Sequence, residues 1–155
     1  MVRLADLPAY EREHLLEKCA DPLGPPAWVA PERDLAEKRI ALITTAGLHF
    51  RDDLAFGLVD DGFRPISGDE DPGQLVMSHS SVNFDRGGFQ EDINTVFPLE
   101  RFRELADAGV VGSLASVHYS FMGAGLPPEA YEAGARGLAG MLKQDRVDAV
   151  FLTPV

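Results

Sequence analysis

The chain has 155 residues, of which 45% are hydrophobic and 25% charged, and its formal net charge is -11 at pH 7. This composition predicts one folded domain with a buried core rather than a disordered or low-complexity chain. The acidic balance argues against a nucleic-acid partner, which would need a basic surface to bind the phosphate backbone.

The apolar runs are too short to cross a bilayer, and the first twenty residues contain several acids and no unbroken apolar stretch. We therefore expect no membrane partner, no signal peptide and a cytoplasmic protein. Cys19 is the single cysteine, which excludes an intrachain disulfide and a metal site made of cysteines alone. We interpret it as a small buried hydrophobe at the end of a short helix over residues 8–19.

Residues 21–32 follow this helix and contain four prolines, which exclude regular structure. Trp28 within this segment is interpreted as an anchor against the folded domain. We expect residues 1–37 to form an N-terminal arm, and residues 38–155 to form a single α/β domain.

Residues 38–45 are predicted to form a strand, because a continuous apolar run follows charged residues, as in strands that are covered on both faces. Further strands are predicted at residues 63–66, 74–78, 110–117 and 147–152, and helices at residues 52–61, 98–108 and 127–144. Pro65 marks an edge strand. Gly134, Gly137 and Gly140 suggest a helix face pressed closely against the sheet. The alternation predicts an open, largely parallel α/β sheet flanked by helices, with Rossmann-like or flavodoxin-like layering.

Residues 82–125 combine many hydrogen-bonding side chains with regularly spaced aromatic residues. A polar loop held down by aromatic anchors is typical of a binding site on a rigid scaffold. This segment is therefore the first candidate site.

Three of the four histidines follow predicted strand ends: His49, His79 and His118. Ligands of open parallel sheets bind outside the carboxyl ends of the strands. If the strands are parallel, these histidines gather on one rim of the sheet, together with neighbouring hydroxyl groups such as that of Tyr119.

Other chemistries are possible for these residues, and the spacing disfavours each. The three histidines lack the short spacing of a zinc motif, and the acids of residues 67–73 do not fit a calcium loop. Ser80 and Ser81 have no G-x-S-x-G elbow around them. Neither Gly47 nor residues 86–88 make a phosphate-binding loop.

Residues 78–125, SHSSVNFDRGGFQEDINTVFPLERFRELADAGVVGSLASVHYSFMGAG, closely resemble the selenoprotein B family of glycine, sarcosine, betaine and D-proline reductases, in particular its short, stand-alone members. Residues 41–49 and 147–155 also match, so that the resemblance covers roughly residues 28–155. It implies a reductase whose selenocysteine, or cysteine in some relatives, attacks a substrate activated for reductive C–N cleavage. A thioredoxin-like partner would return the electrons.

In this family the nucleophile follows a terminal strand like residues 148–155, and the sequence stops where it would be expected. This suggests a selenoprotein shortened at a UGA codon, with an incomplete domain that is inactive by itself. Partner subunits of the larger family members supply a pyruvoyl carbonyl, so other reductase subunits are possible partners. The resemblance implies no cofactor or metal in this chain and a selenocysteine in the full-length protein.

The resemblance assigns roles to residues of the candidate site. His79, His118 and Tyr119 would position or protonate a small amine or amino-acid-like substrate. The pocket would be formed by His49, Ser80, Ser81, Asn83, Asp85 and Arg86, although Asp85 next to Arg86 is most economically a local ion pair or a brace of the loop. The alternative is a non-catalytic, small-molecule-binding or accessory subunit with the same fold, and a zinc enzyme is a distant third.

Overall fold

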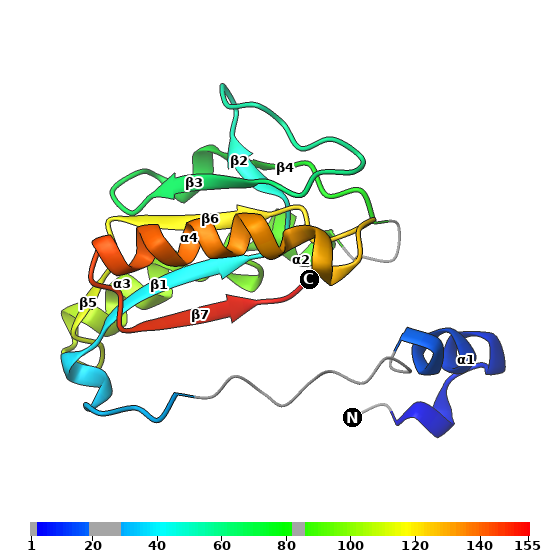
Figure 1. The fold of residues 1–155 in the computed structure, drawn as a ribbon, viewed down its shortest axis with the longest axis horizontal. Helices are drawn as coiled ribbons and strands as arrows, with labels where there is room; N and C mark the ends of the chain where they lie inside the picture. The colour runs from blue at the N-terminus through cyan, green and yellow to red at the C-terminus, as the bar shows by residue number, and fades with distance from the viewer. Residues whose placement is uncertain (1–2, 19–28, 82–85) are drawn as a thin grey trace. The chain divides into compact units, whose positions relative to one another are not determined.

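The computed structural model describes residues 3–18, 29–81 and 86–155 (Figure 1). Its contacts divide the chain into two units, residues 1–32 and residues 33–155. The first unit contains helix α1 (Ala9–Lys18), and the second contains all the strands. The interpretations of Cys19 and Trp28 fall outside the described residues.

Strand β1 (Arg39–Thr44) is the centre of the main sheet. β6 (Val117–Phe121) and β7 (Ala149–Thr153) pair with it in parallel, and the short β5 (Ser113–Leu114) pairs in parallel with its first residues. β3 (Phe63–Ser67) lies antiparallel to β6 at the edge of the sheet. The prediction of a largely parallel sheet is therefore confirmed, with one antiparallel edge strand.

The covered strand and the edge strand were both predicted correctly from local sequence. Ala41 and Leu42 of β1 are completely buried, as expected for a strand covered on both faces. Pro65 lies in β3, at the edge, where its missing N–H removes no central hydrogen bond.

A second, two-stranded sheet was not predicted. β2 (Leu48–Phe50) and β4 (Leu75–Met77) pair antiparallel, with Leu48 opposite Met77. The strand predicted at residues 74–78 is confirmed as β4, but it pairs antiparallel with β2 and is not part of the parallel sheet. The chain turns sharply at Gly47 (φ +64°), whose N–H donates to the Phe121 carbonyl, and this turn sends β2 away from β1.

Helices lie on both sides of the main sheet. Figure 1 shows α4 (Glu132–Gln144) in front of the strands and α3 (Leu99–Asp107) behind them. The remaining helical segments are α2 (Gly87–Glu91) and the 3-10 turns Leu4–Asp6, Leu35–Glu37, Pro72–Gln74, Ile93–Thr95 and Pro128–Tyr131. The main core packs Leu42, Leu48, Ile66, Phe97 and Leu99 together. Among the described residues, no helix is long and apolar enough to cross a membrane.

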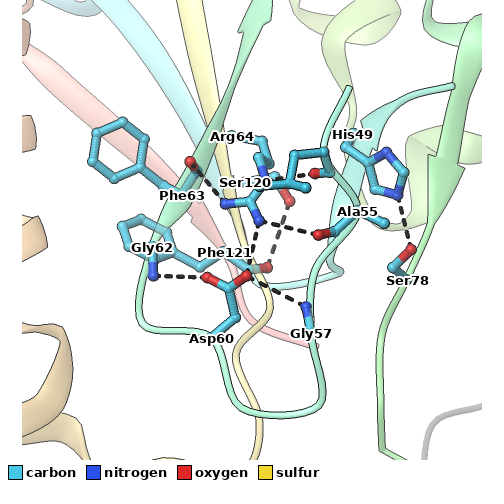
Figure 2. Close-up of polar contacts among 11 residues, drawn as sticks. His49, Ala55, Gly57, Asp60, Gly62, Phe63, Arg64, Ser78, Ser120 and Phe121 are labelled. Atoms are coloured by element: carbon cyan, nitrogen blue, oxygen red, sulfur yellow. Dashed lines mark hydrogen bonds and ion pairs between the residues drawn. The ribbon is translucent and has the colours of Figure 1, made fainter. Parts of the chain in front are cut away.

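Residues 52–61 form a loop, so the helix predicted there is wrong. The Arg64 guanidinium donates to the carbonyls of Leu54 (2.7 Å) and Ala55 (3.2 Å), and it also binds the Asp60 carboxylate (2.8 Å) (Figure 2). Asp60 in turn accepts backbone N–H groups of the loop. These side chains satisfy backbone groups that would otherwise pair within a helix.

The predicted close packing of the glycines in α4 is also wrong. A β-carbon on Gly137 or Gly140 would meet no atom within 4 Å, and one on Gly134 would make an ordinary contact of 3.4 Å with the Asp61 carbonyl. Nothing in the structure explains why residues 137 and 140 are glycines.

Candidate functional site

The carboxyl ends of the three long parallel strands meet at one edge of the main sheet. Thr44 of β1 pairs with Ser120 of β6 and with Thr153 of β7. We call this edge, formed by Thr44, Thr45, Ser120, Phe121 and Thr153, the carboxyl rim. Ligands of open parallel sheets bind at such an edge.

Hydroxyl groups hold the backbone together at the carboxyl rim. They accept N–H groups from Leu48 (Ser120 Oγ, 2.7 Å), Ala46 (Thr44 Oγ1, 3.2 Å) and Val155 (Thr45 Oγ1, 2.8 Å). The Oγ1 atom of Thr153 is buried without a hydrogen-bond partner in the part of the chain that the structure describes. The rim thus fixes the turn after β1 and the last residue of the chain, and leaves one hydroxyl unused.

His79 lies against the turn after β1, although its strand is not part of the parallel sheet. The Ser78 N–H donates to the Gly47 carbonyl (2.9 Å), and a β-carbon on Gly47 would stand 3.0 Å from the His79 nitrogen. His79 is 5% exposed, and its Nδ1 accepts the Ser81 N–H (3.1 Å). Burial and the nearby Arg86 guanidinium lower the pKa of His79, which favours the neutral ring.

Arg86 fixes the segment that carries His79. Its guanidinium donates to the carbonyls of His79 and Ser81. Ser80 contacts Met122 instead, with 3.2 Å between its Oγ and the sulfur. Arg86 therefore braces the backbone on one side of residues 82–85. The predicted pocket residues Asn83 and Asp85 lie outside the described residues.

His49 lies within β2, and both of its ring nitrogens are bonded. Figure 2 shows the bond to Ser78. Nδ1 is 2.7 Å from the Phe50 carbonyl, which only accepts, so this nitrogen carries the proton. Nε2 is 2.8 Å from the Ser78 Oγ and accepts its hydrogen. His49 is 4% exposed and ties β2 to the residue before His79.

His118 lies inside β6, so the prediction that it follows a strand end is wrong; the strand predicted within residues 110–117 is the short β5. The ring is completely buried and packs against Phe97, with 5.9 Å between ring centroids. Nδ1 accepts the Leu42 N–H (3.1 Å), and Nε2 has no hydrogen-bond partner among the residues described. Burial, with help from Arg103 and Arg39 and opposed by Asp145, lowers the pKa of His118 to about 4.

Tyr119 follows His118 in β6 and points to the opposite face of the sheet. It is 3% exposed, and its ring meets Phe63 edge-on with 5.5 Å between centroids. Burial and the Asp145 carboxylate raise the pKa of its hydroxyl. His49 is bonded to Ser78, the residue before His79, and His118 and Tyr119 lie on opposite faces of one strand.

The structure gives no support for a metal site among residues 3–18, 29–81 and 86–155. In these ranges no group of three or more His, Cys, Asp or Glu side chains is placed to hold a metal ion.

An apolar pocket of about 350 Å³ adjoins the carboxyl rim. Its walls include Phe121, Leu126, Pro128, Tyr131 and Ala135, and Thr45 from the rim. Gly123 (φ +73°) also lines it. A β-carbon at this position would stand 2.4 Å from the Thr45 Cβ, so the wall is tightly packed there. Two hollows of about 520 and 470 Å³ lie elsewhere, and no rim residue lines them.

The sequence analysis did not single out this pocket. Phe121 and Gly123 lie in the candidate segment 82–125, so the sequence pointed to the part of the pocket that these two residues form. Tyr131 lies in the turn before α4 and carried no recognisable signal.

Comparisons with known proteins were made with the whole sequence. The family model for glycine/sarcosine/betaine reductase selenoprotein B matches residues 69–155. D-proline reductase subunit gamma of Acetoanaerobium sticklandii is 37% identical over 131 residues, which are 83% of this chain and 53% of that protein. Glycine reductase complex component B subunit gamma of Symbiobacterium thermophilum is 30% identical over 79% of the chain and 30% of that protein.

A third relative, betaine reductase complex component B subunit beta of Peptoclostridium acidaminophilum, is 27% identical over 80% of the chain and 29% of that protein. The chain thus spans about half the length of the first relative and less than a third of the other two. No solved structure matches it significantly, so the Rossmann-like or flavodoxin-like layering stays a prediction. With the family model matching more than half of its residues, the chain belongs to the glycine/sarcosine/betaine reductase selenoprotein B family.

Proposed function

We propose that this chain is a selenoprotein B-type component of a reductase that cleaves the C–N bond of a small glycine-, sarcosine-, betaine- or proline-like amine. The names of its relatives as D-proline, glycine and betaine reductase subunits support the reaction class. The observation that carries the proposal is the bond from the Val155 N–H to Thr45 Oγ1, which holds the last residue at the carboxyl rim.

In this proposal a selenol or thiol directly follows Val155. Val155 packs against the main core, and its N–H is bonded beside the ends of β1 and β7. A residue attached to Val155 would therefore begin at the edge where parallel sheets bind ligands. Its selenolate or thiolate would be the nucleophile, which a low pKa favours.

The residues of this chain would position that reaction. His79, whose backbone carbonyl Arg86 binds, would exchange a proton with the substrate nitrogen. His118 and Tyr119 would act from within β6, as positioning residues behind the carboxyl rim. His49, Ser80 and Ser81 would shape the polar side of the site, with Asn83 and Asp85 completing it.

The partners belong to the same proposal. Since the relatives are named as subunits or components of reductases, other reductase subunits would assemble with this chain. A thioredoxin-like protein would return the two electrons that reductive cleavage consumes.

Two measurements on the native protein test this function. The codon after Val155 should be UGA, and mass spectrometry should find selenium in a species heavier than 16.8 kDa. A UAA or UAG codon, or a selenium-free species that ends at Val155, would overturn the selenol assignment.

One observation favours a second candidate, a non-catalytic binding or accessory subunit. Among the described residues, those that line the apolar pocket include no cysteine, serine or histidine. Native protein that binds small amines but releases no amine product in the presence of a dithiol, with its partner subunits added, would support this candidate.

A further inference from the structure

Strand β7 lies at an open edge of the main sheet (Figure 1). It pairs with β1 along one side, and no described strand pairs with its other side. Alternate N–H and C=O groups of a strand face opposite sides, so some of those of β7 point away from β1. Such groups pair readily with any strand that approaches, and natural edge strands are therefore usually charged, interrupted by proline or covered.

The opposite edge of the sheet, β3, is protected in one of these ways. It contains Pro65, which has no N–H to offer to a further strand. The sequence of β7, AVFLT, contains neither a proline nor a charged residue. One edge of the sheet is thus closed to further pairing, and the other is open to it.

Both faces of β7 expose apolar side chains. Val150, Phe151 and Leu152 are 39%, 42% and 65% exposed. The Phe151 ring contacts Phe102 of α3, with 4.9 Å between centroids, so it lies on the α3 face of the sheet. Val150 and Leu152 therefore lie on the α4 face, because successive side chains of a strand alternate. Apolar residues on both faces are typical of an inner strand of a parallel sheet, and β7 lacks the cover that such a strand has.

The comparisons and the course of the backbone indicate what covers β7. Nearly half of D-proline reductase subunit gamma lies outside the region that this chain matches. The Val155 N–H is bonded to Thr45, and Val155 packs against the main core. These contacts direct the chain toward β1 rather than round the open edge of β7, which disfavours a tight hairpin. A polypeptide continuing from Val155 would reach that edge through a crossover and add a parallel strand.

The handedness of crossovers determines where this connection lies. Crossovers between parallel strands are almost always right-handed. The connection from β6 to β7 already contains α4, on the front of the sheet in Figure 1. A further step outward from β7 keeps the same hand only if its helix lies on the α4 face. This is the face on which Val150 and Leu152 are exposed.

We propose that β7 is an inner strand of the native protein, and that the polypeptide after Val155 contributes the strand that covers it. This strand runs parallel to β7, and the crossover helix that leads to it packs on Val150 and Leu152. The inference rests on the proposed function, in which the native chain continues past Val155, and deepens it by naming the segment that completes the sheet beside the site.

Hydrogen exchange tests the backbone of this edge. The β7 amides should exchange at least about tenfold more slowly in the native protein than in the 155-residue chain, because a covering strand protects them. The matched control is β3, the other edge strand, whose exchange should be the same in both proteins. The inference is overturned if β7 exchanges alike in the two proteins, or slows no more than β3 does.

Two variants of the native protein test the side chains without the 155-residue chain. Leu152→Asp should lower the midpoint of thermal unfolding by at least about 5 °C, because it places a carboxylate beneath the crossover helix. Leu58→Asp, at an 80% exposed position of the loop at residues 52–61, should change the midpoint by less than about 2 °C. Equal midpoints of the two variants would contradict the inference.

A second copy of the chain is the competing occupant of this edge. Protection of β7 in the native protein that disappears on dilution, as a dimer dissociates, would assign the edge to a second copy and overturn the inference. Selenium separates the two proposals. A longer native protein without selenium but with a protected β7 contradicts the proposed function alone, and a selenoprotein with an open β7 contradicts this inference alone. A native protein that ends at Val155 contradicts both.

Discussion

The two ends of the main sheet use polar groups in opposite ways. At the amino end, the Arg39 guanidinium binds the Asp145 carboxylate (2.7 Å) and carbonyl (2.8 Å), the Ser116 hydroxyl (2.9 Å) and the Leu114 carbonyl. At the carboxyl end, Thr153 and Tyr131 keep buried oxygens without partners in the described part of the chain. The Arg39–Asp145 cluster at the amino end is saturated by the protein itself, which suits stability. No comparable cluster of bonds satisfies the Thr153 and Tyr131 oxygens among the described residues.

The pKa of Asp145 reflects the saturated end. Its burial alone would raise this pKa, but hydrogen bonds from Arg39 and from the Ser116 N–H lower it below its usual value. The carboxylate is therefore ionised at neutral pH and fully engaged. If the comparison is right, substitutions at the amino end should change stability, and substitutions at the carboxyl end should mainly change binding.

The largest expected effect is a pH-dependent loss of stability from His118, on which Arg39, Arg103 and Asp145 all act. Its pKa is about 4 in the folded chain against 6.5 for the free side chain. Between these values the unfolded chain takes up the proton and the folded chain does not. The His118 contribution is thus complete above pH 6.5 and is lost on acidification toward pH 4, by about 3 kcal/mol.

His118→Asn tests this, because an amide oxygen can still accept the Leu42 N–H but does not titrate. Urea unfolding from pH 7.5 to 4.5 should give a shallower loss of free energy in this variant than in the wild type. Parallel losses would show that other groups cause the acid sensitivity.

Next in size is the loss of the Arg39 network. Arg39→Met should lower the free energy of unfolding by about 2 kcal/mol, because it leaves the half-buried Asp145 carboxylate without its cation. The matched control is Arg136→Met, which breaks an exposed ion pair to Glu132 and should cost about 0.5 kcal/mol or less. Urea unfolding measures both, and similar losses would remove the contrast between the sheet ends.

At the carboxyl end, Gly123→Ala should be the exception that lowers the free energy of unfolding, by about 1 to 2 kcal/mol. The added β-carbon would collide with Thr45, and the positive φ of +73° strains any residue with a side chain. Gly109→Ala is the control for strain alone, since its φ is +70° and its β-carbon would meet no atom within 4 Å. Urea unfolding measures both, and equal losses of free energy would show that the contact of Gly123 with Thr45 adds nothing to the strain of a positive φ.

The smallest expected effect is at Thr153. Thr153→Val replaces a buried hydroxyl that has no described partner by a methyl group of similar size. The free energy of unfolding of this variant should therefore fall by no more than about 0.5 kcal/mol, or rise slightly. A loss above about 1 kcal/mol would mean that the hydroxyl is bonded in solution and that this end is also saturated.

Local sequence predicted what local forces determine. The apolar run of β1, the amphipathic helix α3 and the proline of β3 were interpreted correctly because each depends on nearby residues. The wrong predictions concern segments whose structure depends on residues that are distant in the sequence. Arg64 keeps residues 52–61 out of a helix, and β4 joins β2 instead of the main sheet.

The candidate site shows the same division. Glycine and hydroxyl residues at the carboxyl rim lie where a parallel sheet predicts them. The position of His118 was missed because β6 alternates polar and apolar residues, so it lacked the continuous apolar run used to locate strands. Tyr131 was missed because its role depends on Phe121, which another element contributes.

The register of β1 also has a consequence for synthesis on the ribosome. Arg39 donates its N–H to Asp148, 109 residues later, and β7 follows Asp148. The central strand β1 is therefore synthesised roughly a hundred residues before β7, its partner on one side. Until β7 has emerged from the ribosome, that edge of β1 has no strand to pair with, and an unpaired strand edge exposes a nascent chain to aggregation.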